Sequence, residues 1–207
     1  MSPLIRLCSG VALVAPPVAA VTVLAAGWFA PGYDPVTRTV SRLAVPGAST
    51  AGAVDVAMLT AGLACIAVAV GVRSGIGGRA SLALAGFGFV AAGVFHLDPL
   101  SLRLSAPHWA GSGLAVLGLT VAPLALWRAY GRLLLGLGAA EVAMLLVGLA
   151  LLPTSFVAWG AWERVLLMLG LSSIVFLGVR IRRRERRMPS SEEAARAMAA
   201  VHSSAGT

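Results

Sequence analysis

The sequence predicts an all-α membrane protein, a polytopic bundle of about six transmembrane helices. Three features of the composition lead to this class. Apolar residues make up 58% of the chain, charged residues make up 12%, and the mean hydropathy is +0.90. A soluble domain carries roughly 25% charged residues, so this chain has about half the charge that a water-facing surface needs. The composition therefore excludes a soluble globular enzyme, a disordered tail and a secreted disulfide scaffold.

The apolar stretches give the expected elements in order, because one transmembrane helix needs about 20 mostly apolar residues. Six stretches qualify, at residues 7–29, 50–71, 80–96, 108–128, 133–152 and 160–181. The connections at 72–79 and 128–132 are short turns, whereas the other three are longer and contain proline and polar residues. Residues 1–181 are therefore predicted to form three helical hairpins, followed by a mobile tail over 182–207 that is first basic and then acidic.

The first span has two possible fates. Small residues at 24–27 follow its apolar run, as in a signal peptide, but the run is long and contains Pro16 and Pro17, which favours a retained helix. The loop after it contains Asp34-Pro35, a pair typical of a helix start. A short amphipathic helix is expected there, with Arg38 and Arg42 on its polar face as a lid over a negative group or as contacts to lipid phosphates.

The third and fourth spans are rich in glycine and alanine, which let membrane helices approach closely. Two spans carry an acid: Asp55 on the second and Glu141 on the fifth. Neither can face lipid cheaply, so both are expected to point into the bundle. Cys8 and Cys65 lie in apolar runs and are expected to be packing residues rather than a disulfide or a metal site.

Arginines predict the orientation, since cytoplasmic loops carry an excess of positive charge. All 16 basic residues are arginines, and 12 of them lie at the termini and in the two short turns. Both termini are therefore expected in the cytoplasm of a multi-pass plasma-membrane protein, with the longer loops outside. Seven arginines fall in the last 28 residues, where anionic lipid is the expected partner and nucleic acid is not.

Ionisable side chains gather at the predicted outward ends of the hairpins. Each longer loop carries or borders one acid: Asp34, Asp98 or Glu163. If the hairpins pack as a bundle, these carboxyl groups share one rim with His96 and His108. Ionisable groups near a bilayer are costly, so this rim is the candidate site.

Aromatic residues gather at the same end. A belt at the membrane interface explains this placement without any activity. The same rings would also suit a pocket that stabilises a cation on ring faces. The residues are Trp28, Phe29, Tyr33, Phe95, Trp109, Trp159 and Trp162.

Four short motifs stand out: Tyr33-Asp34-Pro35, Thr39-Val40-Ser41-Arg42-Leu43, Gly93-Val94-Phe95 leading into Asp98-Pro99, and His108. Together they resemble the bacterial membrane family catalogued as domain of unknown function 998, over about residues 10–180. The resemblance implies a compact multi-helix membrane fold. His96-Leu97 departs from the family pattern, in which a proline and a small polar residue are expected.

In overall plan, the chain has a weaker likeness to the small integral-membrane terpene cyclases of meroterpenoid pathways. In that group, acidic residues facing an aromatic-lined cavity protonate an alkene or an epoxide. The likeness implies that Asp34, Asp98 and Glu163 are the positions that match in role.

The leading hypothesis is a metal-independent membrane enzyme doing acid–base chemistry on a lipid-like substrate, most concretely proton-initiated cyclisation of a prenyl chain. Asp98 or Glu163 would donate the proton, and Asp34 or His108 would take the final one. The expected substrate-binding residues are Arg38, Arg42, Phe95, Trp109, Trp159 and Trp162.

Other hypotheses stay open. Asp55 and Glu141 could couple protons in a small-solute carrier, or the chain could be a non-catalytic membrane subunit or assembly factor. A serine with His108 and Asp98 could form a hydrolytic triad, and His96 with His108 could hold a haem. The leading hypothesis needs no cofactor and no metal, and the sequence leaves the oligomeric state open.

Overall fold

The structure, a computed structural model, describes residues 3–73, 75–98 and 100–187. Within these ranges the chain forms α-helices and one short 3-10 helix, η1, and no strand. The elements are α1 (Pro3–Phe29), η1 (Val40–Ala44), α2 (Ala51–Gly71), α3 (Ile76–Val94), α4 (Leu102–Tyr130), α5 (Arg132–Leu151) and α6 (Trp159–Arg187). Six described helices are long and apolar enough to cross a membrane. The predicted all-α bundle with six spans is therefore confirmed.

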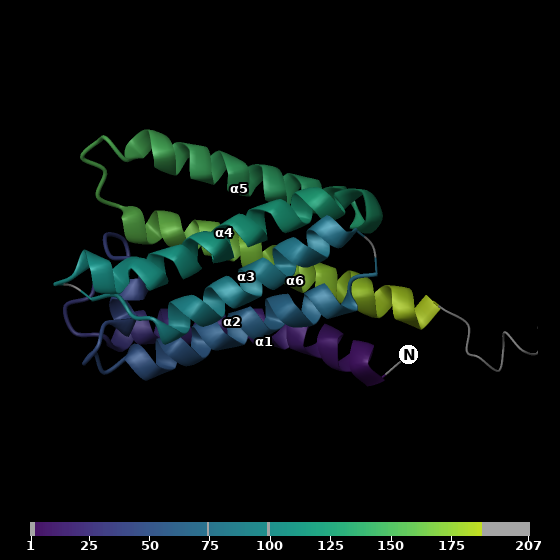
Figure 1. Ribbon diagram of the computed structural model, residues 1–207, viewed down its shortest axis with the longest axis horizontal. Coiled ribbons are helices and arrows are strands. Elements are labelled where there is room, and N and C mark those ends of the chain that lie inside the picture. The colour runs from purple at the N-terminus through teal and green to yellow at the C-terminus, as the bar shows by residue number, and fades with distance from the viewer. Residues whose placement is uncertain (1–2, 74, 99, 188–207) are drawn as a thin grey trace, which may run out of the picture.

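The helices run antiparallel along one long axis (Figure 1). The connections at 30–50, 95–101 and 152–158 lie together at one end of the bundle, here called the loop end. The first residues of α1, the two short turns and the last residues of α6 lie at the other end, here called the turn end. This is the arrangement of three hairpins, while the side of the membrane that each end faces stays a prediction.

Each helix packs against the next one along the chain, and α6 closes the bundle by contacting α1, α2, α4 and α5. Small residues permit the closest approach, between α3 and α4. A Cβ atom on Gly88 would lie 2.6 Å from the carbonyl oxygen of Gly111, and one on Gly118 would lie 2.6 Å from the backbone nitrogen of Ala85. Backbone therefore meets backbone across this helix pair.

The predicted spans leave a loop at 97–107, and this prediction is wrong over most of its length because α4 begins at Leu102. Ser101 caps the helix: its hydroxyl accepts a hydrogen bond from the backbone nitrogen of Leu104 at 3.2 Å. Asp98 stabilises the preceding turn by accepting a hydrogen bond from the backbone nitrogen of Leu100 at 2.8 Å. His108 consequently lies inside α4 rather than at its start.

The expected amphipathic helix after Asp34 is also wrong. Residues 35–38 form a turn, Thr39 is extended with φ −65° and ψ 155°, and only η1 follows. Its apolar side chains, including the buried Leu43, pack into the bundle against α1 and α2 rather than lying in the membrane interface. The segment is therefore part of the protein core.

Residues 182–187, the first part of the predicted tail, continue α6 as helix. Residues 188–207 of the predicted tail lie outside the described residues. Cys8 and Cys65 are both buried and unpaired.

Candidate functional site

A cavity of about 380 Å³ lies at the loop end, between α1, α2, α3, α4, α6 and η1. Its walls are mostly alanine, valine, leucine and methionine side chains, with the aromatic rings of Phe89, Trp109 and Trp162. The polar residues that line it are Ser41, Ser112, Glu163 and Arg164. An apolar pocket of a few hundred Å³ with a few convergent polar groups is the usual form of a small-molecule site.

Glu163 is the predicted acid that reaches this cavity. It lies in the first turns of α6, and its Oε2 accepts a hydrogen bond from the backbone nitrogen of Val40 at 2.5 Å. The contact joins α6 to the first residue of η1. A carboxyl group is thereby fixed at the wall of an otherwise apolar space.

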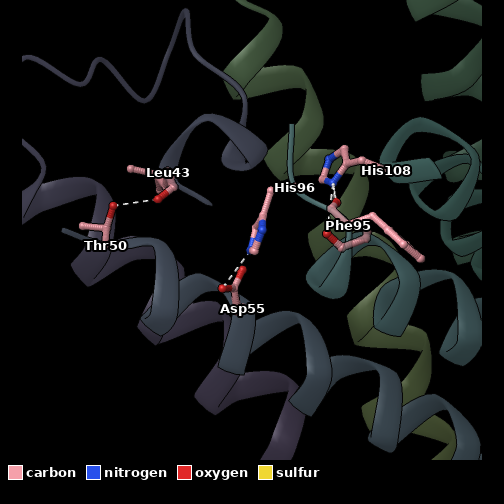
Figure 2. Close-up of polar contacts among 7 residues, drawn as sticks. Leu43, Thr50, Asp55, Phe95, His96 and His108 are labelled. Atoms are coloured by element: carbon pink, nitrogen blue, oxygen red, sulfur yellow. Dashed lines mark hydrogen bonds and ion pairs between the residues drawn. The ribbon is translucent and has the colours of Figure 1, made fainter. Parts of the chain in front are cut away.

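His108 lies directly behind the cavity wall, with only 1% of its surface exposed. Its Nδ1 lies 2.9 Å from the carbonyl oxygen of Ala92 and 2.8 Å from that of Phe95 (Figure 2). Carbonyl oxygens only accept, so Nδ1 carries a proton. Its Nε2 lies 2.9 Å from the hydroxyl of Ser41, which lines the cavity.

This arrangement fixes the roles of both groups. In the neutral ring Nε2 has a lone pair, so the Ser41 hydroxyl donates its hydrogen bond to that nitrogen. The result is a serine with its base, oriented by two backbone carbonyls. Asp98, the acid of the triad alternative, does not contact His108, because the carbonyl groups of Ala92 and Phe95 occupy its Nδ1.

Arg164 holds the segment between α1 and η1 in place. Its Nη1 donates to the carbonyl oxygens of Pro35 at 2.8 Å and Arg38 at 3.2 Å, and its Nη2 donates to the hydroxyl of Tyr33 at 2.6 Å. Burial raises the pKa of Tyr33, while the neighbouring Arg164 opposes that rise. Because the segment carries Val40 and Ser41 to the cavity, Arg164 acts as a positioning residue.

The sequence reasoning missed Ser41 and the clamp by Arg164. Ser41 stood in a motif without any assigned role, and its partner is 67 positions away. Arg164 belongs to the ionisable residues at the predicted outward ends, but the sequence assigns it no contact. Its place beside Glu163 near the start of α6 was the available signal, since an arginine that is partly shielded from water needs several acceptors.

The other predicted acids cap turns. Asp34 accepts hydrogen bonds from the backbone nitrogen of Val36 and the hydroxyl of Thr37, and these bonds lower its pKa. Asp98 is bonded to the turn before α4. Neither carboxyl group is among the residues that line the cavity. The three predicted acids therefore do not share one site.

The expected substrate-binding residues separate in the same way. Trp109 and Trp162 line the cavity, whereas Arg38 and Arg42 are exposed and do not. Phe95 does not line the cavity either and contributes its carbonyl group to His108.

Trp159 supports the site indirectly. Its ring stacks edge-on between Phe156 and Trp162, with centroid distances of 5.1 and 5.7 Å. Trp162 in turn donates from its indole nitrogen to the carbonyl oxygen of Met144 at 2.9 Å. Trp159 thus fixes a ring of the cavity wall without facing the cavity.

A second polar pair lies at the loop end. His96 points toward Asp55 on α2, and its Nε2 is 3.0 Å from Oδ2 of the carboxylate (Figure 2). Thr50 and Leu43 are joined nearby through a hydroxyl–carbonyl hydrogen bond of 2.7 Å. The two histidines of the haem alternative thus contact different protein partners, Asp55 for His96 and Ser41 with two carbonyl groups for His108.

The two acids of the carrier hypothesis do not meet. Asp55 contacts His96. Glu141 lies on α5 with 1% of its surface exposed. Its Oε1 is close to α6, where a Cβ atom added to Gly170 would lie 3.1 Å away. Within the described part of the chain, neither carboxyl oxygen of Glu141 has a hydrogen-bond partner. Among the described residues, no three histidine, cysteine or acidic side chains are placed to hold a metal ion.

Six apolar helices among the described residues, packed around a cavity, define a multi-pass membrane protein. The family described as "Protein of unknown function (DUF998)" matches residues 13–180, and the chain belongs to this family. No curated protein and no solved structure matches the chain. The weaker likeness to membrane terpene cyclases finds no support in these comparisons.

Proposed function

We propose that this protein is a membrane enzyme that does acid–base chemistry on a lipid-like substrate in the loop-end cavity. The observation that carries the proposal is that Glu163 and Ser41 line the same apolar cavity, and that the Ser41 hydroxyl is hydrogen-bonded to His108 behind the wall. The sequence offered two candidate proton donors and two candidate acceptors. One of each, Glu163 and His108, stands at the cavity or directly behind its wall.

The most concrete reaction is proton-initiated cyclisation of a prenyl chain. Protonated Glu163 adds its proton to an alkene carbon, and the alkene electron pair forms the new C–H bond. The resulting cation lies near the rings of Phe89, Trp109 and Trp162, whose faces stabilise positive charge. A second alkene closes the ring by forming a C–C bond.

The final proton then leaves a carbon beside the cation. Ser41 accepts it while passing its own hydroxyl proton to Nε2 of His108. The substrate gains one proton and loses one, so the product is an isomer of the substrate. Exchange of the proton between His108 and Glu163 through solvent resets the site.

A second reaction class is favoured by the same hydrogen bond. Ser41 can attack an ester carbonyl as its proton moves to Nε2 of His108, and the leaving alcohol then takes that proton. The acyl group stays on Ser41 until water or another alcohol removes it. This acyl transfer needs no carboxyl group at Glu163.

One experiment separates the two classes. The purified protein in lipid nanodiscs is incubated in heavy water with lipid extract from the producing cell, and the products are read by mass spectrometry. Cyclisation gives an isomeric product carrying one deuterium, and Glu163→Gln abolishes it. Acyl transfer gives an acyl adduct on Ser41, which Glu163→Gln retains and Ser41→Ala abolishes.

The matched control is Asp34→Asn, which changes an exposed acid outside the cavity and should keep full turnover. If no extract yields a product or adduct with the wild-type protein, the enzyme proposal is wrong. A carrier would instead show transport that depends on Glu141, and a non-catalytic subunit would show neither behaviour.

A further inference from the structure

A second pocket lies at the turn end, where α4, the turn at Gly131 and the end of α6 meet. It is an open pocket of about 360 Å³, lined by positively charged side chains together with residues 129–131. The charged residues are Arg128, Arg180, Arg183 and Arg184. Arg128 comes from α4 and the other three come from α6, so the pocket exists only in the folded bundle.

Aromatic rings hold three of these arginines. The guanidinium of Arg184 lies 4.4 Å from the ring centroid of Tyr130, and an Arg184 nitrogen also donates to the carbonyl oxygen of Ala129. Arg180 lies 5.0 Å from the ring of Phe176. Arg128 lies 5.4 Å from the ring of Trp127. These contacts order the guanidinium groups in advance of any ligand.

The backbone at Gly131 shapes the pocket. It has φ +125°, a conformation that favours glycine, and a Cβ atom there would lie 2.8 Å from Nη2 of Arg180. The Nε of Arg180 is buried and has no hydrogen-bond partner among the described residues. An unmet donor therefore belongs to one of the arginines that line this positively charged site.

No carboxylate of the described side chains lines this pocket. The described acidic side chains lie elsewhere: Asp34, Asp55, Asp98 and Glu163 at the loop end, and Glu141 within α5. Four guanidinium groups brought together in one pocket repel one another, so an anion would relieve that repulsion.

We propose that this pocket binds a phosphate group. Arginines present forked donors that match phosphate oxygens, and a phosphate group has more acceptor oxygens than a carboxylate for several arginines to share. The pocket lies at the turn end of the six candidate spans, and lipid headgroups lie at the ends of membrane spans. A lipid phosphate or a soluble phosphate compound would meet the same donors.

The test uses the full-length protein, stripped of lipid in a non-ionic detergent. Native mass spectrometry measures the affinity for phosphatidylglycerol, with phosphatidylcholine as the zwitterionic comparison. A thermal shift with inorganic phosphate tests the soluble source. The pocket variant is the double substitution Arg128→Gln with Arg183→Gln, in which both side chains are exposed and line the pocket.

The matched control is Arg182→Gln with Arg186→Gln, which removes the same charge from exposed positions of α6 that do not line the pocket. The pocket variant should bind phosphatidylglycerol or phosphate about tenfold or more weakly, because charge-assisted hydrogen bonds are lost, while the control keeps wild-type affinity. A shift with phosphate alone assigns the site to a soluble compound. Equal weakening of both variants, or no wild-type binding of either probe, overturns the proposal.

Discussion

The hydroxyl of Ser41 lies 2.9 Å from Nε2 of His108, and this hydrogen bond joins η1 to α4 across 67 positions of the chain. His108 in turn donates from Nδ1 to the carbonyl groups that end α3. The imidazole therefore connects three elements around one wall of the cavity. Its partners make it both a structural connection and the base for any chemistry at Ser41.

Ser41→Ala should destabilise the protein measurably. It leaves Nε2 of His108 buried without a donor, at a cost of about 1–3 kcal/mol. The free energy of unfolding in mixed detergent measures the effect. Ser112→Ala is the control, since Ser112 lines the same cavity without a hydrogen bond to another described side chain, and it should change stability by less than about 0.5 kcal/mol. Equal losses for both variants would contradict the assigned role of Ser41.

Glu163→Gln should separate structure from chemistry. The glutamine carbonyl still accepts the hydrogen bond from the backbone nitrogen of Val40, so the fold is retained. Its amide cannot act as an acid, so cyclisation in the nanodisc assay should slow by about 100-fold or more. Melting temperature and turnover are measured on the same preparation. A large drop in both would assign Glu163 to the fold rather than to the reaction.

Gly118→Ala should weaken the α3–α4 pair. Its new methyl group would overlap the carbonyl oxygen of Ser81 and lie 2.6 Å from the backbone nitrogen of Ala85, and backbone atoms cannot yield cheaply. We expect a loss of about 1–3 kcal/mol in unfolding experiments. Gly113→Ala in the same helix meets no described atom within 4 Å, so stability should stay level or rise slightly.

Gly160→Ala should release the segment between α1 and η1. A methyl group there would overlap the carbonyl oxygen of Arg38 and lie 2.6 Å from that of Pro35. Limited proteolysis should cut residues 30–45 faster in this variant than in wild type, because the backbone can no longer pack on α6. The control, Gly136→Ala in α5, has open space and should keep the wild-type cleavage rate. Unchanged cleavage in the Gly160 variant would show that the segment is held by other contacts.

Hydropathy was sufficient to predict the six spans and their pairing into hairpins. A membrane helix must make all its backbone hydrogen bonds internally and present apolar side chains to lipid, so each span is a long apolar stretch. The helix limits at the loop end were less predictable. Ser101 starts α4 early through its own hydroxyl. The carbonyl groups of Pro35, Val36 and Arg38 accept hydrogen bonds from Arg164 and from the backbone nitrogen of Ala161, both on α6, instead of from a local helix. Such bonds to distant residues have no local sequence pattern.

The candidate site was predictable only in part. Gathering of polar residues at one end follows from the span order, and that end does hold the cavity. Which acid faces the cavity depends on side-chain direction within the packed bundle. Asp34 and Asp98 each precede two residues whose backbone nitrogens they can cap, a local alternative that Glu163 on α6 lacks. That difference in local sequence was the available signal.

Asp34 should give the folded state a pH dependence of known sign. Hydrogen bonds from the backbone nitrogen of Val36 and the hydroxyl of Thr37 lower its pKa in the folded protein. The resulting stabilisation is present above the ordinary pKa of aspartate and is lost as the pH falls through the lowered folded value. The Asp34→Asn variant keeps a side-chain acceptor but cannot ionise. Its melting temperature should therefore be lower than that of wild type at pH 7, and the two should converge in acid. A difference that stays constant from pH 7 down to about pH 2 would show that the Asp34 charge does not stabilise this turn.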